Sequence, residues 1–262
     1  MENKVVWITG ASSGIGKALA IEWSQYSVCL ILSGRNIDAL KKVAGRCKER
    51  GSSCLILDFD LNDIESYPKW VDTALEWKGS IDYLVNNGGI SQRGLAHETD
   101  VAVDQSIIHL DLIAPIALTK AVLPFMISRD SGHIITISSL VGKFGSPYRS
   151  AYSAAKHGLH GFFDSTRAEL HKTSLSFTVL CPGFVHTQVS VNGLGPNGIP
   201  TGKMDDATQN GISPERFASR ALKAIISQKR EAYIGGWEVA GIYVSRWFPG
   251  LFAKMIRKAK VV

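Results

Sequence analysis

The N-terminal region contains the stretch Thr9-Gly10-Ala11-Ser12-Ser13-Gly14-Ile15-Gly16, between an apolar run at 4–9 and a helical pattern at 14–26. Three glycines at such a junction permit a tight turn, let the backbone approach a phosphate, and let the helix pack closely on the strand. The helix N-terminus then presents free N–H groups to an anion. The stretch therefore predicts a dinucleotide site, with contacts from Gly10, Ser12, Ser13, Gly14, Ile15 and Gly16.

Apolar runs and helical patterns alternate along the rest of the chain. Continuous apolar runs such as 28–32 are typical of strands covered on both faces. Their alternation with helices predicts right-handed βαβ crossovers, and so a single-domain α/β fold: a doubly wound parallel sheet of the Rossmann type in three layers. We expect strands at 4–9, 28–33, 53–59, 81–86, 132–138, 175–181 and 231–234, and helices at 14–26, 37–50, 63–77, 100–128, 151–172 and 214–228.

Composition agrees with one large globular domain. The 262 residues are 45% hydrophobic and 20% charged, which argues against disorder or a coiled coil. The four cysteines show neither CxxC nor metal-ligand spacing, so we interpret them as buried free thiols and expect no metal site. We see no secretory signal and no uninterrupted apolar run of about 18 residues, so we expect a cytoplasmic protein without a membrane span.

The net charge of +6 is concentrated near the C-terminus. Five basic residues and no acid lie between residues 246 and 262, namely Arg246, Lys254, Arg257, Lys258 and Lys260. Removing these five charges from +6 leaves +1 for the rest of the chain. The overall charge therefore does not indicate a nucleic-acid partner.

The end of the second expected strand distinguishes NAD from NADP. An NAD site commonly has an acid there, whereas a basic residue accommodates a 2′-phosphate. The sequence reads Leu32-Ser33-Gly34-Arg35-Asn36, with no carboxylate before Asp38. Because Arg35 is permanently charged, we expect NADP(H) rather than NAD(H). The alternative is that Arg35 is a solvated surface side chain.

Two further strand ends lie at the same edge of the expected sheet. Asp58-Phe59-Asp60-Leu61 ends the third strand, where a carboxylate either accepts from an adenine amino group or serves a turn. Asn86-Asn87-Gly88-Gly89 ends the fourth strand, where amides and small residues allow a cofactor to approach the backbone. The contacts expected here come from Asp60, Leu61, Asn87, Gly88 and Gly89.

A candidate catalytic pair follows in Ala151-Tyr152-Ser153-Ala154-Ala155-Lys156. Residues four apart share a helix face, so the Lys156 ammonium lies near the Tyr152 phenol and favours its ionised form. Such a phenol can exchange a proton with an alkoxide while hydride moves to or from carbon. Ser139, at the end of the fifth expected strand, is positioned to donate a hydrogen bond to a carbonyl oxygen.

In five stretches in register, across residues 4 to 234, the sequence resembles the short-chain dehydrogenase/reductase family. These are Thr9–Gly16, Asn86–Gly89, Ser138-Ser139, Tyr152–Lys156 and Pro182-Gly183-Phe184-Val185-His186-Thr187. The resemblance implies that Tyr152 is the general acid/base, that Ser139 orients the substrate oxygen, and that Lys156 also binds the nicotinamide ribose. It implies that Val185 and Thr187 touch the carboxamide. It further implies a homodimer or homotetramer.

The resemblance also places Asp111 where the family has the helix asparagine of its catalytic tetrad. An ionised aspartate accepts hydrogen bonds but cannot donate them, so the proton relay changes. Its charge stabilises Lys156 as an ammonium and opposes a Tyr152 phenolate. We expect activity to survive, weakened or with a shifted pH optimum. A second departure is Gly88, where the family usually has alanine.

Two segments beyond the motifs bear on the substrate. Residues 184–213 form a long irregular stretch after a strand end, which we interpret as a substrate lid within a dinucleotide-binding catalytic domain spanning 1–235. Residues 236–262 form a basic and aromatic extension. Two interpretations stand open for it: cover for the pocket or a subunit contact, and, through residues 237–262, peripheral contact with a membrane. Pro249-Gly250 would interrupt a continuous helix there.

These residues predict an NADPH-dependent oxidoreductase that interconverts a ketone or aldehyde and its alcohol. The segment around Gly161-Phe162-Phe163 and the long stretch 184–213 resemble the branch of the family that acts on lipophilic carbonyls, which implies a lipophilic substrate. The partner is then a small-molecule carbonyl or alcohol substrate. The alternative is a non-catalytic NADPH-binding sensor or scaffold, for which Asp111 is the main support.

Overall fold

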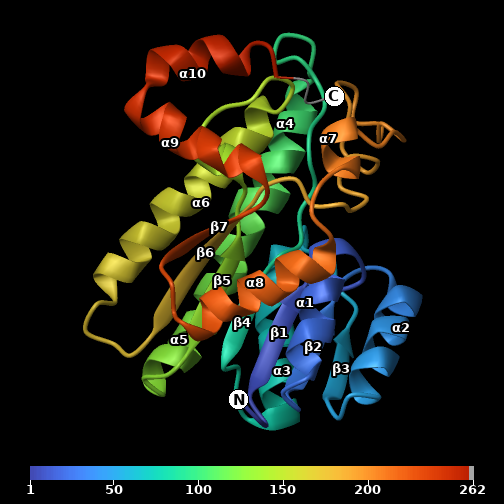
Figure 1. Cartoon of the computed structure of the whole chain (residues 1–262). Helices are drawn as coiled ribbons and strands as arrows, with labels where there is room; N and C mark the ends of the chain where they lie inside the picture. Colours follow the sequence, from blue (N-terminus) through green and yellow to red (C-terminus); the bar gives the residue numbers. More distant parts are fainter. Residues whose placement is uncertain (260–262) are drawn as a thin grey trace.

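The first apolar run forms β1 (Val5–Thr9), which lies in the middle of a parallel sheet in the computed structural model (Figure 1). The structure describes residues 1–259, and within them the sheet has seven strands in the order β3-β2-β1-β4-β5-β6-β7. The other strands are β2 (Cys29–Ser33), β3 (Ser53–Leu57), β4 (Tyr83–Asn86), β5 (His133–Ile137), β6 (Ser176–Pro182) and β7 (Glu231–Ile234).

The strand order reverses beside β1. The chain first adds β2 and β3 on one side of β1, and then adds β4 through β7 on the other. Ligands of open α/β sheets bind at such a reversal, outside the carboxyl ends of the strands. This topology confirms the predicted doubly wound sheet and places the predicted site residues at one edge.

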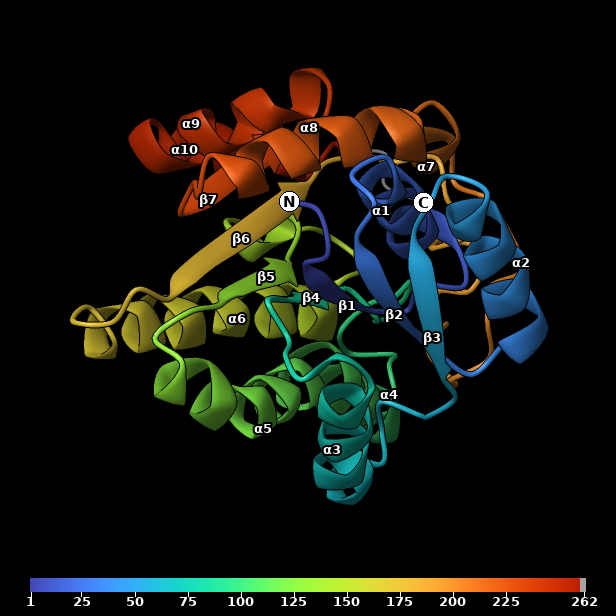
Figure 2. The ribbon, with the colours of Figure 1, turned by 90° about the horizontal axis from the view of Figure 1, so that it is seen from below.

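Helices cover both faces of the sheet, which confirms the three layers (Figure 2). One face is covered by α1 (Gly14–Ser24), α2 (Ile37–Lys48) and α8 (Pro214–Ile226). The other is covered by α3 (Tyr67–Lys78, preceded by the 3-10 turn η1, Ile64–Ser66), α5 (Ala114–Ser128) and α6 (Ser150–Glu169).

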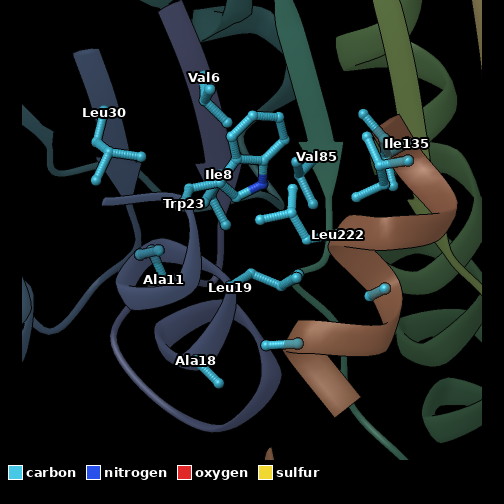
Figure 3. Packing of buried hydrophobic residues seen from close by; sticks show 14 of the residues in the cluster. Val6, Ile8, Ala11, Ala18, Leu19, Trp23, Leu30, Val85, Ile135 and Leu222 are labelled. Carbon is cyan, nitrogen blue, oxygen red and sulfur yellow. The ribbon is translucent and has the colours of Figure 1, made fainter. Parts of the chain in front are cut away.

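Apolar packing fixes α1 and α8 against the sheet. Trp23 and Leu19 of α1 and Leu222 of α8 are buried against Ile8 of β1 and Val85 of β4 (Figure 3). Burial of each such side chain stabilises the fold by about 1.5 to 3 kcal/mol. Ile8 lies just before the glycine loop, and Val85 lies just before Asn87. This cluster therefore holds the start of α1 at the sheet edge where the site lies.

Side chains cap the starts of two of the predicted helices. The Asn36 side chain accepts from the Ala39 N–H at 3.0 Å, and Ser213 Oγ accepts from the Arg216 N–H at 3.1 Å. Each cap satisfies one of the backbone donors that a helix leaves free at its N-terminus. The boundaries predicted for α2 and α8 therefore have a direct structural cause.

The helix expected at 100–128 is divided in three. It consists of α4 (Val101–Ile108), the π-helical turn η2 (His109–Ile113) and α5, and the Ala114 N–H bonds to the His109 carbonyl, five residues back. Pro115 has no N–H to donate to the Asp111 carbonyl, which makes a regular α-helical turn incomplete at this point. The widened turn packs against α6, the helix that carries Tyr152 and Lys156.

This segment is also long and apolar enough to cross a membrane, with a mean hydropathy of 1.8 over its most apolar window. However, 44% of that window is buried, and α4 and η2 pack on α6 while α5 packs on α3. Length and composition alone are weak evidence for a span, since the core helix of a folded domain satisfies the same test.

The segments after β6 close over the sheet edge. Residues 184–213 are mostly irregular and contain the short helix α7 (Asp206–Gln209). After β7 come the 3-10 turn η4 (Trp237–Val239), α9 (Ala240–Trp247) and α10 (Pro249–Ile256). The predicted break at Pro249 is therefore confirmed. Lys260 lies outside the described residues.

Candidate active site

A cleft of about 1810 Å³ opens at the carboxyl ends of the strands. Every predicted cofactor and catalytic residue except Gly16 lines it. Residues from the 184–213 segment and from α9 and α10 complete its walls. The fold thus brings together predicted residues that are up to 177 positions apart in the sequence, from Gly10 to Thr187, around one cavity.

The glycine loop has the close approach that the sequence predicts. Gly16 packs on the loop itself, because a Cβ at this position would meet the Gly10 carbonyl and lie 2.5 Å from Asn87 Nδ2. Gly14 has a φ of +52°, a backbone conformation that residues other than glycine rarely adopt. Ser13, the N-cap of α1, makes no side-chain cap bond. The first N–H groups of α1 therefore remain available to an anion in the cleft, as a pyrophosphate requires.

Thr9 and Asn87 join the glycine loop to the end of β4. Thr9 Oγ1 accepts from the Asn87 N–H at 2.9 Å and from the Gly88 N–H at 3.0 Å. Asn87 Nδ2 donates to the Thr9 carbonyl at 2.8 Å. This network explains why an amide follows β4, and it identifies Thr9 as a site residue that sequence reasoning did not single out.

At the end of β2, Arg35 reaches across to the end of β3. Arg35 Nη1 lies 3.6 Å from Asp60 Oδ2, and the Arg35 side chain is 71% exposed. Asp60 Oδ1 also accepts from the Asn62 N–H at 2.9 Å, so Asp60 has a turn role as well as a place in the cleft wall. An exposed pair at this separation contributes little to stability, which leaves the guanidinium available to a ligand.

Tyr152 and Lys156 lie on one face of α6, as their spacing predicts. Lys156 Nζ is 5.4 Å from the centre of the Tyr152 ring and donates to the Ile137 carbonyl at 3.2 Å. Both side chains line the cleft. The start of α6 is held by Gln92, whose Oε1 accepts from the Ala151 N–H at 2.9 Å and the Tyr152 N–H at 3.4 Å. Gln92 fixes the position of Tyr152 and was not predicted.

Asp111 forms a buried ion pair with the same lysine. Asp111 Oδ2 lies 3.1 Å from Lys156 Nζ, and Asp111 Oδ1 accepts from the Ile90 N–H at 2.8 Å. Burial alone would lower the pKa of Lys156, but the Asp111 carboxylate and Tyr152 together outweigh burial, so the pKa is raised and Lys156 stays an ammonium. Burial raises the pKa of Asp111, and the Lys156 ammonium partly offsets this.

Ser139 lies directly after β5, with an extended backbone (φ −163°), and its Oγ accepts from the Val141 N–H at 3.3 Å. It begins the 3-10 turn η3 (Leu140–Gly142), which packs on α6. The neighbouring Ser138 Oγ donates to the Lys156 carbonyl at 3.2 Å. The loop that carries Ser139 is therefore bonded to the helix that carries Tyr152 and Lys156.

The end of β6 forms the opposite wall. Val185 is buried, and its backbone pairs with Ile212. A Cβ built at Gly14 would lie 3.4 Å from Thr187 Cγ2, so Thr187 lies directly against the glycine loop. By contrast, His186 is exposed and outside the cleft lining. Val185 and Thr187 therefore line the cleft, whereas His186 does not.

A buried ion pair anchors the 184–213 segment beside the site. Arg93 donates two hydrogen bonds to Asp205 Oδ2, from Nη2 at 2.6 Å and from Nε at 3.2 Å. Arg149 Nη2 lies 3.7 Å from the same oxygen. Asp205 also caps α7 by accepting from the Thr208 N–H at 2.7 Å. Arg93 follows β4 and Arg149 precedes α6, so no local sequence signal links either of them to Asp205.

His160 also has partners from distant elements. Three side-chain atoms that could bind a metal, one each from His160, Cys181 and Glu231, lie within 4.8 Å of one another, although the sequence shows no metal-ligand spacing. Lys143 Nζ lies 2.8 Å from Glu231 and 3.3 Å from His160 Nδ1, so an ammonium already neutralises the carboxylate. Burial lowers the pKa of His160 to about 4. The four cysteines are free, and Cys29, Cys47 and Cys181 are buried as predicted, whereas Cys54 is only half-buried.

Comparison with known proteins adds sequence evidence to this geometry. A profile of the family described as short chain dehydrogenase matches residues 4–194. Among curated proteins, the chain is 43% identical over 239 residues to "Dehydrogenase/reductase SDR family protein 7-like" of Anopheles gambiae, covering 89% of this chain and 75% of that protein.

Solved structures show the same fold. A short chain dehydrogenase/reductase from Burkholderia phymatum in complex with NAD superposes with a TM-score of 0.85 at 19% identity, covering 100% of this chain and 97% of that one. A metagenomic short-chain oxidoreductase in complex with NADP superposes with a TM-score of 0.73 at 27% identity, covering 89% and 97%. The two neighbours thus hold different nicotinamide dinucleotides.

Proposed function

Because this chain belongs to the short-chain dehydrogenase/reductase family, we propose that it is an NADPH-dependent oxidoreductase that interconverts a lipophilic ketone or aldehyde and its alcohol. One observation carries the proposal. Tyr152 and Ser139 line the same cleft as the open N-terminus of α1, with a charged Lys156 buried behind the phenol. A dinucleotide site and a proton donor therefore meet in one cavity.

The residues of the cleft fit a nicotinamide dinucleotide. The N–H groups at the start of α1 suit a pyrophosphate, and Gly10 and Gly16 let the loop that presents them pack tightly against Asn87. Val185 and Thr187 would border the nicotinamide, and Lys156 would hold its ribose. Arg35, exposed at the end of β2 without a carboxylate before Asp38, supports NADPH because a guanidinium matches a 2′-phosphate.

A bound nicotinamide supplies or accepts the hydride at the substrate carbon. In the reducing direction, the Ser139 hydroxyl donates a hydrogen bond to the carbonyl oxygen and holds it beside Tyr152. The Tyr152 phenol then gives its proton to that oxygen as negative charge develops there, and the alcohol forms. The Lys156 ammonium stabilises the resulting phenolate until a proton from solvent restores the phenol. In the oxidising direction the same groups act in reverse.

The remaining walls support a lipophilic substrate. Apolar side chains come from η3 and its flank, from the 184–213 segment, and from the C-terminal helices. Phe252 of α10 packs on Phe144 with ring centres 4.8 Å apart, which brings the C-terminal helices over the Ser139 side of the cleft. We propose 184–213 as the substrate lid, anchored at Asp205. The apolar contributors are Leu140, Val141, Phe144, Phe184, Val189, Leu194, Val244, Phe252, Met255 and Ile256.

The test measures NADPH oxidation in the presence of a panel of lipophilic ketones and aldehydes. The loss of the reduced-nicotinamide absorbance monitors the reaction. Tyr152→Phe should lower turnover by about 10² to 10⁴-fold while NADPH binding persists, because only the transferable proton is lost. Tyr148→Phe is the matched control, since Tyr148 is four residues away and outside the cleft lining. Undiminished turnover in Tyr152→Phe would refute the mechanism.

A second candidate, a non-catalytic NADPH-binding sensor or scaffold, is favoured by one observation only. Asp111 neutralises the ammonium that should stabilise a Tyr152 phenolate. The same panel distinguishes the two functions. NADPH binding without turnover on any substrate in either direction would favour the sensor.

A further inference from the structure

The C-terminal helices expose an unusual set of large apolar side chains. Six of them lie between residues 237 and 255, and Trp237 and Trp247 are 87% and 74% exposed. So many large apolar side chains exposed within 19 consecutive residues indicate an interaction site rather than the scattered apolar exposure of an ordinary surface. We name this set the outer face: Trp237, Tyr243, Trp247, Phe248, Leu251 and Met255.

The α9–α10 hairpin is apolar on two sides. Its inner side chains include Ile242, which is buried, and Phe252, which contacts Phe144 in the cleft wall. The outer-face residues Tyr243 and Trp247 are four apart on α9, and Leu251 and Met255 are four apart on α10, so each pair shares one side of its helix. The inner contacts explain how the hairpin is held. On the outer face Tyr243 also lies against Tyr233 of β7, with ring centres 6.5 Å apart, whereas Trp247, Phe248 and Leu251 remain more than half exposed.

The charges around the outer face have one sign. Arg246, Lys254, Arg257 and Lys258 are all exposed. Between residues 236 and 259 the only acid is Glu238, and its carboxylate is turned inward, accepting from the Phe184 N–H at 3.0 Å and the Gly236 N–H at 2.9 Å. The surface therefore combines tryptophans and aliphatic side chains with exposed positive charge alone.

We infer that the α9–α10 hairpin docks the protein onto an anionic lipid bilayer. Tryptophan favours the boundary between head groups and acyl chains, and basic side chains bind anionic head groups. A second copy of the chain fits less well, because a two-fold contact would bring the same four cations against one another. The hairpin lies at the margin of the molecule, away from the N-terminus, where a flat surface can reach it (Figure 1).

Docking places the cleft at the lipid surface. Met255 belongs to both surfaces, since it lines the cleft and is 51% exposed on the outer face. A lipophilic substrate dissolved in the bilayer could then pass along Met255 into the cleft without crossing water. This delivery step rests on the proposed function, whereas the docking itself does not.

Docking is tested by pelleting the full chain with phosphatidylcholine vesicles that do or do not contain phosphatidylserine. We expect the protein to pellet with the anionic vesicles, and we expect high salt to weaken this binding. The triple variant R246Q/K254Q/R257Q should bind about fivefold more weakly for each charge removed. W247S/L251S should weaken binding roughly tenfold or more, because the apolar area that enters the bilayer is lost.

Matched controls lie elsewhere on the surface. K172Q/K223Q/K229Q removes three exposed charges away from the hairpin, and I226S removes an exposed apolar side chain, so both should pellet like the wild type. Unchanged melting temperatures would show that the hairpin variants fold. The inference is wrong if the wild type fails to pellet, if the hairpin variants pellet equally well, or if W247S/L251S dissociates a lipid-free oligomer in sedimentation velocity. Pelleting requires no turnover, so its failure leaves the proposed function intact.

Discussion

The Asp111 carboxylate lies 3.1 Å from the Lys156 ammonium, and both side chains are buried. Two opposite charges this close nearly cancel when seen from a third group such as the Tyr152 phenol, 5.4 Å from Lys156 Nζ at its ring centre. The lysine then stabilises a phenolate less than an unpaired lysine would. The ion pair therefore presents less net positive charge to the phenol than Lys156 would present beside a neutral residue at position 111.

Asp111→Asn should move the acidic limb of alcohol oxidation, along which the rate rises with pH, to lower pH, because the Lys156 charge beside the phenol is then unopposed. The substitution keeps the side-chain shape and an oxygen for the Ile90 N–H, but removes the charge that opposes the phenolate. The measurement is the pH profile of kcat at saturating cofactor. An unchanged midpoint, or complete inactivity of a folded Asp111→Asn protein, would contradict this account of the pair.

Arg35→Ala should weaken NADPH binding by about tenfold or more and leave NADH binding nearly unchanged, because only NADPH carries the 2′-phosphate. Titration of both cofactors measures the two dissociation constants directly. Arg46→Ala, an exposed position on α2 outside the cleft lining, controls for the loss of a surface charge. Equal affinities for NADPH and NADH in the wild type would refute the assignment of Arg35.

The sequence was sufficient for the fold and for most of the site because its signals are local. Glycines at 10, 14 and 16, the helical spacing of Tyr152 and Lys156, and the amide after β4 each depend on neighbouring residues alone. Even the π-turn at His109–Ile113 has a local signal in Pro115, although a continuous helix was expected.

What the sequence could not provide are pairings between remote segments. Arg93 and Asp205 are 112 positions apart, and their bond depends on how the 184–213 segment folds back over β4. Likewise, His160 meets Glu231 only because α6 and β7 both lie next to β6. Periodicity and spacing carry no information on such contacts, since they describe one element at a time.

His133 should make stability depend on pH. Burial lowers the pKa of His133 from 6.5 to about 4. Its stabilising contribution is therefore complete above about pH 6.5 and is lost as pH falls toward 4, by about 3 kcal/mol. Because Thr178 Oγ1 donates to the Lys229 carbonyl at 2.6 Å, His133 Nε2, at 2.8 Å, must be the donor to Thr178.

His133→Gln keeps an N–H donor but cannot titrate, so urea unfolding of this variant should change less between pH 6.5 and 4 than that of the wild type. His97→Gln, at a side chain that is 78% exposed, should behave as the wild type does. A His133→Gln protein with the full wild-type pH dependence would show that another group is responsible.

Asp205→Asn should destabilise the 184–213 segment and raise KM more than it lowers kcat. The variant leaves Arg93 buried without its carboxylate, and breaking a buried pair in this way costs about 3 to 5 kcal/mol. Burial opposes the Asp205 charge, but bonds from Thr208 and Arg93 outweigh burial and lower the pKa of Asp205. The wild-type contact should therefore persist at all pH values above the usual aspartate pKa of about 3.9 and weaken only below it.

Asp206→Asn, at the exposed neighbouring position, is the matched control for Asp205→Asn. Thermal melting and limited proteolysis of both variants measure the effect, and cleavage within 184–213 that is equally slow in Asp205→Asn and Asp206→Asn would show that the Arg93 pair does not anchor the segment.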